Sequence, residues 1–337
     1  DGPALEVKYS PAIDLIVAAE SAGPQRAKGE ILKANGGVNP WRERAKAVAT
    51  PFEMSDLDLL FEPVSTAIFL FYAVFWEGNH RIDQLLEYLE SSSENELLER
   101  FRGFLQIDPE TTNWINVNTI EEFLVKDRDR ENVPYRKEAE QLVALLTRPD
   151  QFRLKLVDVL TWFNDRVFQD HAAESKGRSE EWIATMEPRF TTDRRGVLNR
   201  LLNDTYDSIL STAPKITVFP TCDSATSTTW TMIPQEAYVV IGVGHADRMI
   251  PSDGEGPASE LRTDEVIEAL ADPKRIALLR LLRRRSLFGR EIATELGISP
   301  STASYHIDKL VAARLVRLEL SSGRRFYYAI NAEGFRD

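Results

Sequence analysis

The sequence predicts a mainly α-helical, α+β protein. A large helical N-terminal domain with a small antiparallel β element is followed by a smaller C-terminal domain of short helices and a β-hairpin. Three observations lead to this fold class. Helix signals dominate residues 1–210, three segments rich in β-branched residues follow, and residues 244–259 combine three Gly and two Pro with no apolar periodicity. We therefore divide the chain into an N-terminal domain at 1–243, a linker at 244–259 and a C-terminal domain at 260–331.

The N-terminal domain is expected to be a helical bundle that ends in strands. Several predicted helices are opened by a proline or an acidic residue. The predicted helices are 11–22, 63–76, 82–89, 94–105, 134–147, 149–168 and about 193–210. Residues 215–219, 228–233 and 237–243 are predicted strands because they are rich in β-branched and aromatic residues and bounded by Pro or Gly. We expect them to form a small antiparallel sheet just before the linker.

Composition is typical of a soluble globular protein. With 337 residues, of which 43% are hydrophobic and 28% charged, the chain is long enough for two domains with their own cores. The most apolar run, Ala67–Trp76, has ten residues, and a membrane-spanning helix needs about 20. The single cysteine, Cys222, cannot form an internal disulfide, and no secretory pattern opens the chain. We expect a cytoplasmic location and no membrane partner.

Charge changes sign at the same boundary. The whole chain has 41 Lys and Arg against 53 Asp and Glu, a net charge of −12. Residues 258–337 contain 14 Lys and Arg against 11 Asp and Glu, a net of +3, which leaves −15 for residues 1–257. The acidic total therefore does not exclude a nucleic-acid partner for the C-terminal part.

The C-terminal domain is predicted to contain short helices joined by a tight turn. Asp272-Pro273 is an N-cap followed by proline at the first helical position, and three arginines close an apolar face, so a helix is expected at 273–284. A second apolar stripe stops at Gly297, which can take the left-handed conformation at a helix end. The next helix follows after a turn of about three residues. This is the helix-turn-helix arrangement, whose second helix can enter the DNA major groove.

That second helix, at residues 299–310, has an apolar and a polar face. Ala303, Ile307, Leu310 and Val311 recur at the i, i+4, i+7, i+8 spacing and are expected to pack inward. On the polar face, hydroxyls can donate to phosphates or base edges, Tyr and His can reach base edges, and Lys is a natural phosphate contact. The predicted DNA contacts here are Ser299, Ser301, Thr302, Ser304, Tyr305, His306 and Lys309.

A hairpin after this helix favours DNA binding over a polar face that is merely solvated. Residues 315–320 and 326–330 alternate apolar and polar side chains around the turn Ser321-Ser322-Gly323. Arg324 and Arg325 at the tip would then reach the DNA backbone or the minor groove. Both arginines join the predicted DNA contacts.

These motifs together resemble the winged helix-turn-helix repressors of the ArsR class. The resemblance covers about residues 261–331. It rests on the runs A-L-A-D-P-K-R-I-A-L-L-R-L-L, then G-R-E-I-A-T-E-L-G-I-S-P-S-T-A-S-Y-H-I-D-K-L, then G-R-R-F-Y-Y. It implies a bacterial or archaeal transcription regulator, usually a dimer on an inverted repeat, whose DNA affinity an effector changes.

The sequence departs from the metal-sensing members of this class. The helix before the recognition helix starts L-F-G-R-E-I-A where those members have a cysteine pair, and the sequence runs only seven residues past the second wing strand at Ile330. We therefore expect no metal site and no cofactor, and His306 is more readily a DNA contact than a metal ligand. A homodimer would have to use the helix around residues 264–270, the N-terminal domain, or both.

The N-terminal domain offers one candidate effector pocket. Its runs Y-S-P, I-T-V-F-P-T and Y-V-V-I-G-V-G are similar to a poorly characterised helical domain that precedes the winged helix in some longer regulators of the class, a likeness that assigns no ligand. Aromatic side chains are core by default, but apolar cavities in helical domains also bind small molecules. The candidate pocket residues are Phe69, Tyr72, Phe75, Trp76 and Trp162.

Other candidate chemistry in this domain has a simpler explanation. Gly242-Val243-Gly244 lacks a third glycine and a following helix, so it is more readily a strand end than a phosphate loop. His245 and Asp247 have no further His or Cys nearby and are expected to be linker residues. Cys222 is expected to be an inert apolar side chain.

Three functions remain open at this point. The first is a sequence-specific regulator, a dimeric repressor on double-stranded DNA, whose N-terminal domain dimerises and senses a small molecule or a partner. The second is an interaction module whose acidic N-terminal domain binds a partner protein. The third is an enzyme with a DNA-binding tail, which would need a polar constellation that spacing does not reveal. We expect the first function and no enzymatic activity.

Overall fold

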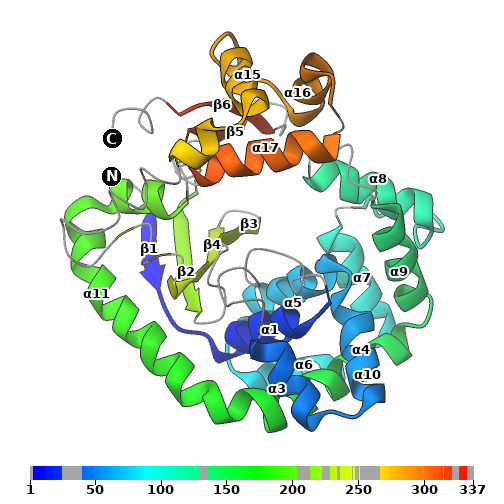
Figure 1. Cartoon of the computed structure of the whole chain (residues 1–337). Helices are drawn as coiled ribbons and strands as arrows, with labels where there is room; N and C mark the ends of the chain where they lie inside the picture. Colours follow the sequence, from blue (N-terminus) through cyan, green and yellow to red (C-terminus); the bar gives the residue numbers. More distant parts are fainter. Residues whose placement is uncertain are drawn as a thin grey trace.

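The computed structural model has a large N-terminal domain of helices beside a small sheet, and a C-terminal group of helices with a hairpin (Figure 1). The described residues are 3–24, 40–105, 107–128, 135–202, 213–221, 228–233, 236–244, 246, 250, 266–298, 300–313, 315–320 and 326–331. The mainly helical fold class is confirmed.

Several helices of the N-terminal domain begin at capping residues or at a proline. In chain order they are α1 (Pro11–Ala22), α3 (Pro40–Val48), α4 (Pro51–Phe61), α5 (Val64–Glu77), α6 (Ile82–Ser91), α7 (Glu94–Phe104), α8 (Val117–Arg128), α9 (Arg136–Leu146), α10 (Pro149–Phe163), the π-helical segment η2 (Asn164–Phe168) and α11 (Gln169–Leu201). The Ser10 hydroxyl accepts from the backbone N–H of Ile13 at 3.4 Å and caps α1, while Thr50 and Glu53 form a capping box at α4. Proline occupies the first turn of α1, α4 and α10, where its missing N–H costs nothing.

Most of the expected helices have counterparts close to their predicted bounds. The segment expected at 193–210 begins where predicted, because Asp193 (φ −143°, ψ 65°) interrupts α11 and its Oδ1 accepts from the backbone N–H of Gly196 at 2.9 Å. Residues 203–212 lie outside the described residues. The sequence pattern misses α3, α4, α8 and the part of α11 before Asp193. The buried positions of that stretch keep a helical spacing and are Ser175, Ser179, Trp182, Met186 and Phe190. Because the first two are serines, an apolar periodicity does not reveal them.

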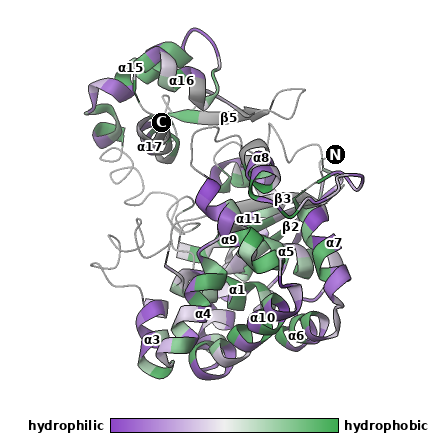
Figure 2. Ribbon diagram, turned by 90° about the vertical axis from the view of Figure 1, so that its right-hand side faces the viewer, coloured by the Kyte–Doolittle hydropathy of each residue, from purple (hydrophilic) through white to green (hydrophobic). Residues whose placement is uncertain are grey.

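Helix α1 lies at the centre of the N-terminal domain. Eleven of its twelve residues are buried, and it packs against α3, α5, α6, α10 and β2. Figure 2 shows this helix among the apolar faces of its neighbours. Asp14 is fully buried and accepts hydrogen bonds from the Tyr9 hydroxyl at 3.1 Å and the Ser175 hydroxyl at 2.6 Å. Such donors are what a carboxylate needs to be tolerated in an apolar interior.

The sheet corrects the expected antiparallel element. It contains β1 (Ala4–Val7), β2 (Lys215–Thr221), β3 (Thr228–Ile233) and β4 (Glu236–Gly242) in the order β1-β2-β4-β3. β1, β2 and β4 are parallel, and β3 alone runs antiparallel, at the edge beside β4. The antiparallel prediction holds only for β3 and β4. It was wrong for β2, because β2 does not pair with β3, the next strand in the sequence, but lies parallel to β4 and to β1 from the start of the chain.

Both faces of the sheet are covered by helices. On one face, Phe75 of α5 stacks on Phe219 and Tyr238 with ring-centroid distances of 5.4 and 4.5 Å. On the other face, Val218 lies in one apolar cluster with Trp182 of α11. The N-terminal domain therefore has three layers at this side: α5 with the bundle, the sheet, and α11.

The C-terminal domain has an apolar cluster of its own. Its elements are a short helix at 266–270, α15 (Pro273–Leu282), α16 (Gly289–Leu296), α17 (Pro300–Ala312), β5 (Val316–Leu320) and β6 (Phe326–Ile330). Leu278 of α15, Ile292 of α16 and Leu310 of α17 are fully buried in its centre. The three helices therefore fold around one shared core.

None of the described helices alone has the length and apolar content to cross a membrane. Only α4 combined with Thr66–Glu77 of α5 meets that test, as a pair bent by 75°.

We predict that Phe101→Ala destabilises the N-terminal domain by about 3 to 5 kcal/mol, the usual cost of emptying a buried phenylalanine site. Phe101 is fully buried and stacks on Phe69 at a centroid distance of 4.5 Å. Phe52→Ala is the matched control, because Phe52 is 71% exposed. Urea unfolding followed by circular dichroism measures both, and equal unfolding midpoints for the two variants would contradict the assignment of the core.

Candidate nucleic-acid interface

Helices α16 and α17 are joined by the tight turn that the sequence predicts. Gly297 ends α16 in the left-handed conformation, with φ 59° and ψ 40°, and the backbone N–H of Ile298 donates to the carbonyl of Ala293 at 3.1 Å. A Cβ on Gly297 would meet no atom within 4 Å, so the glycine is needed for its backbone conformation and not for space. Helix α17 starts at Pro300, so the element has helix-turn-helix geometry.

The inward face of α17 is the one that the spacing predicts. Ala303 and Ile307 are 1% exposed and Leu310 is fully buried, while Val311 is half-buried. On the opposite side, Thr302 is exposed and Tyr305 is 55% exposed. Both therefore present their hydroxyl groups at the surface of α17, on the side where the sequence predicts contacts with DNA.

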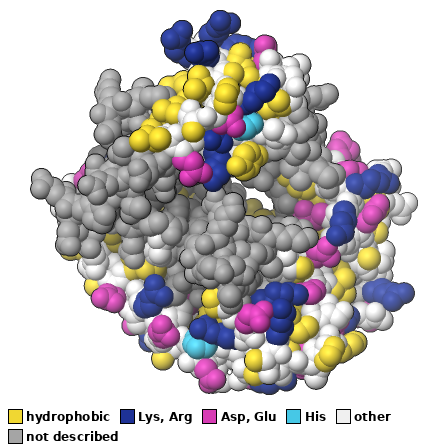
Figure 3. Space-filling model, in the orientation of Figure 1, with side chains coloured by type: hydrophobic (Ala, Val, Ile, Leu, Met, Phe, Trp, Pro, Cys, Tyr) yellow, Lys and Arg dark blue, Asp and Glu magenta, His cyan; other side chains and the backbone are white. Residues whose placement is uncertain are grey.

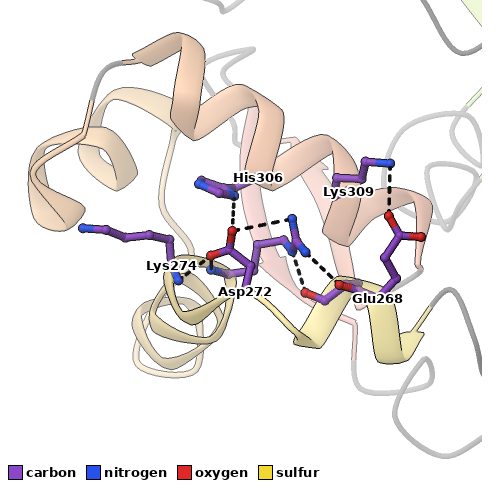
Figure 4. Close-up of polar contacts among 7 residues, drawn as sticks. Glu268, Asp272, Lys274, His306 and Lys309 are labelled. Atoms are coloured by element: carbon purple, nitrogen blue, oxygen red, sulfur yellow. Dashed lines mark hydrogen bonds and ion pairs between the residues drawn. The ribbon is translucent and has the colours of Figure 1, made fainter.

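His306 does not lie on the outward face. Its side chain is 6% exposed, and Nδ1 lies 3.9 Å from Oδ2 of Asp272, just before α15 (Figure 4). The expectation of an outward-facing imidazole was therefore wrong. The reason is that Ala303, His306, Ile307 and Leu310 follow the i, i+3, i+4, i+7 positions of one helical face, so the inward face is wider than its apolar residues alone suggest.

Lys309 also makes contact within the domain. The side chain is half-buried, and Nζ lies 3.9 Å from Oε1 of Glu268 in the short helix at 266–270. Its contact with a DNA phosphate stays a prediction.

The remaining predicted contacts fall where the structure describes little or nothing. Ser299, Arg324 and Arg325 lie outside the described residues. Ser301 and Ser304 belong to α17 by their backbone, and their side chains are not described.

Asp272 is the centre of a polar network that connects three helices (Figure 4). As the sequence predicts, it caps α15, because Oδ1 accepts from the backbone N–H groups of Lys274 at 2.7 Å and Arg275 at 3.4 Å. Burial by itself would raise the pKa of Asp272. The two backbone donors, with the nearby charges of His306 and Arg275, outweigh burial and lower this pKa, so the carboxyl group stays ionised at neutral pH.

Arg275 extends this network to the short helix at 266–270. The guanidinium is buried, and it donates to the carbonyl of Ala269 at 2.6 Å and to the carbonyl of Glu268 at 2.7 Å. It therefore satisfies the last carbonyls of that helix. Apolar periodicity does not predict this role. The sequence signal for it is an arginine three residues after an N-cap aspartate, within reach of the preceding chain.

The wing strands are confirmed. β5 and β6 pair antiparallel with Val316 opposite Ile330. Leu287, before α16, joins them by two backbone hydrogen bonds with Tyr328 of 3.0 and 2.8 Å. The hairpin is thereby fixed to the helix-turn-helix, although its tip at 321–325 lies outside the described residues.

Basic side chains also gather at the end of α15. Arg283, Arg284 and Arg285 are exposed after its last turn, and Arg285 pairs with Glu291 at 2.8 Å. Figure 3 shows Lys and Arg side chains in dark blue over this end of the C-terminal domain. They give the C-terminal domain a cationic surface, whereas the N-terminal domain has a net negative charge.

The candidate effector pocket is only partly assembled. Phe69, Tyr72 and Trp76 line a hollow of about 20 Å³ between α5, α6 and α7. One water molecule needs a cavity of about 10 to 15 Å³, so the hollow has space for a water and not for a larger molecule. Phe75 faces the sheet instead, and Trp162 on α10 packs beside Phe163 at a centroid distance of 5.7 Å.

The other candidate groups form no site in the described part of the chain. Gly242 is the last residue of β4, as the expected strand end requires, but Val243, Gly244 and Ala246 are helical, so the expectation that no helix follows was wrong. Cys222, His245 and Asp247 lie outside the described residues. Among the residues that are described, no group of three or more His, Cys, Asp or Glu side chains is placed to hold a metal ion.

Comparison with known proteins agrees with the helix-turn-helix geometry. Residues 272–317 match the family model described as bacterial regulatory protein, arsR family. The match spans α15, α16, α17 and the first residues of β5. No curated protein and no solved structure matches the chain. The chain therefore carries, at residues 272–317, an ArsR-family helix-turn-helix domain, the DNA-binding domain of transcriptional regulators.

Proposed function

We propose that this protein is a sequence-specific DNA-binding repressor that works as a dimer, and that its N-terminal domain dimerises and senses a small molecule or a partner protein. In this proposal the protein has no catalytic role. The observation that carries it is the surface of α17. A family-matched recognition helix presents Thr302 and the 55% exposed Tyr305 on the side opposite its buried face.

The distribution of charge supports contact with DNA through the C-terminal domain only. Residues 258–337 have a net charge of +3, whereas residues 1–257 have −15. DNA attracts the first part and repels the second, so the acidic domain orients the protein with its C-terminal domain towards the duplex.

A dimer is favoured because one recognition helix reads only a few base pairs. Two copies linked through the protein contact two half-sites, and the second contact is then intramolecular. The C-terminal domain offers exposed apolar side chains that suit such an association, since Ile267 is 60% and Ile276 is 37% exposed. The N-terminal domain supplies the rest of the interface in this proposal.

Sensing by the N-terminal domain has two routes. A small molecule at the hollow beside Phe69 and Tyr72 would require α5, α6 and α7 to move apart, because the hollow of about 20 Å³ holds one water. A partner protein needs no such movement, and Trp76, which is 52% exposed at the same place, is the type of residue that anchors protein interfaces.

We predict that Tyr305→Ala weakens specific DNA binding roughly tenfold or more, the usual range for loss of one good contact with a base. Electrophoretic mobility shift with genomic promoter fragments at about 0.15 M salt measures this. Phe52→Ala, an exposed aromatic of the N-terminal domain, is the control and should bind like the wild type. Equal affinity of the Tyr305 variant and the wild type on every retarded fragment would contradict the proposed recognition surface.

The Arg324→Ala/Arg325→Ala double variant is expected to lose phosphate or minor-groove contacts without losing sequence preference. The slope of log affinity against log salt should become shallower by roughly 2, about 1 for each cation removed. Fluorescence anisotropy over a salt series gives the slope. Arg136→Ala in the N-terminal domain is the matched control, and an unchanged slope in the double variant would remove the wing from the DNA interface.

Two half-sites with their centres about 10 base pairs, or roughly 34 Å, apart are expected in hydroxyl-radical footprints, because two linked recognition helices enter successive major grooves. Light scattering should give the mass of two chains for the free protein and for the complex. A single chain both with and without DNA would exclude the dimer.

A further inference from the structure

We propose that His306 is a positioning residue for DNA recognition, which holds α17 in place through Asp272 and does not itself touch DNA. The proposal rests on the DNA-binding function proposed above. It assigns a role to the one predicted contact residue that is buried among the side chains described on α17.

His306 lies directly behind the recognition surface. It follows Tyr305 in the helix, and the two rings meet edge to face with a centroid distance of 5.5 Å. One ring is 6% exposed and the other 55% exposed. The buried imidazole therefore packs against an exposed ring of the recognition surface.

Asp272 uses its two carboxylate oxygens for two different helices. Oδ1 accepts the backbone N–H groups that cap α15, at 2.7 and 3.4 Å. Oδ2 lies 3.9 Å from Nδ1 of His306 and 3.9 Å from Nη1 of Arg275. One carboxylate thus contacts both the start of α15 and the middle of α17.

A second contact lies one turn further along α17. Lys309 is three residues after His306, so both are on the same side of the helix, and its ammonium lies 3.9 Å from Glu268. The carbonyls of Glu268 and Ala269 are held in turn by Arg275. The recognition helix is therefore connected at two successive turns to the chain just before α15 (Figure 4). Base readout needs side chains held within about 0.5 Å, so contacts that restrain α17 relative to the rest of the domain favour it.

The contact between His306 and Asp272 depends on protonation. At 3.9 Å the two atoms are too far apart for a hydrogen bond, and Nδ1 has no hydrogen-bond partner among the described residues. The attraction is therefore strong only when the imidazole is charged. The charged groups around it are Asp272, Arg275, Lys309 and Glu268. The contact is therefore electrostatic, and its strength depends on the charges of these groups.

The variants His306→Gln and Asp272→Asn test this arrangement. Asparagine caps helices as well as aspartate does, so Asp272→Asn keeps the start of α15 and removes the charge that faces His306 and Arg275. His306→Gln leaves the contact between Asp272 and Arg275 in place and so isolates the contribution of His306. Each single variant should weaken specific DNA binding roughly tenfold, and the double variant should be no weaker than either one, because coupled neighbours are not additive. Urea unfolding midpoints of the full chain check that each variant folds; if His306→Gln does not, Asp272→Asn alone carries the test.

A pH series provides the readout that packing alone would not change. The series covers the range in which imidazoles in general change charge, about pH 5 to 8, and the wild-type profile should contain a component that both single variants lack. Loss of affinity that is additive in the double variant, or a pH profile identical in wild type and His306→Gln, would overturn the proposal.

Tyr305→Ala separates this inference from the function on which it rests. If Tyr305→Ala weakens binding and the His306 and Asp272 variants do not, the positioning role is wrong and DNA recognition by α17 stands. If wild-type protein retards no fragment specifically, or Tyr305→Ala binds as wild type, the proposed function itself fails.

Discussion

The parallel pairing of β1 with β2 governs the architecture of the N-terminal domain. Parallel neighbours cannot be joined by a tight turn, so the chain must leave one end of the sheet after Val7 and return to the other end before Lys215. The helices from α1 to α11 are contained in that connection. Because β4 is also parallel to β2, the bundle and α11 can cover opposite faces of one small sheet, and both apolar faces of the strands are removed from water.

Sequence patterns correctly predicted the features that depend only on neighbouring residues. The N-cap at Asp272, the left-handed Gly297 and the alternating strands of the wing each depend on residues within a few positions of one another, and all three have the predicted form. The pairing of Ala4 with Lys215 depends on distant parts of the chain, and no periodicity reports it. Helix α11 was missed for a different reason, since Ser175 and Ser179 occupy buried positions that apolar patterning assigns to solvent.

The candidate DNA interface shows the same division. Apolar spacing placed Ala303, Ile307 and Leu310 correctly and left Tyr305 at the surface. It could not place His306, because whether an imidazole is buried depends on a partner, and that partner comes 34 positions earlier in the chain, just before another helix. The candidate pocket residues were grouped because they are aromatic. In the structure their side chains leave the helix in different directions and do not meet at one site. Phe69 and Tyr72 border the hollow, whereas the Phe75 ring lies on the sheet.

Strand β1 also limits how far this protein can be truncated from its N-terminal side. Removing residues 3–10 would delete an edge strand together with the serine that caps α1, although those residues are remote in sequence from β2. Shortening the N-terminal domain from its beginning is therefore as disruptive as cutting into its last strands. The C-terminal domain shares no strand with this sheet and keeps its own apolar core. Because the two hydrophobic clusters share no residue, a fusion that keeps each domain whole should leave both cores intact.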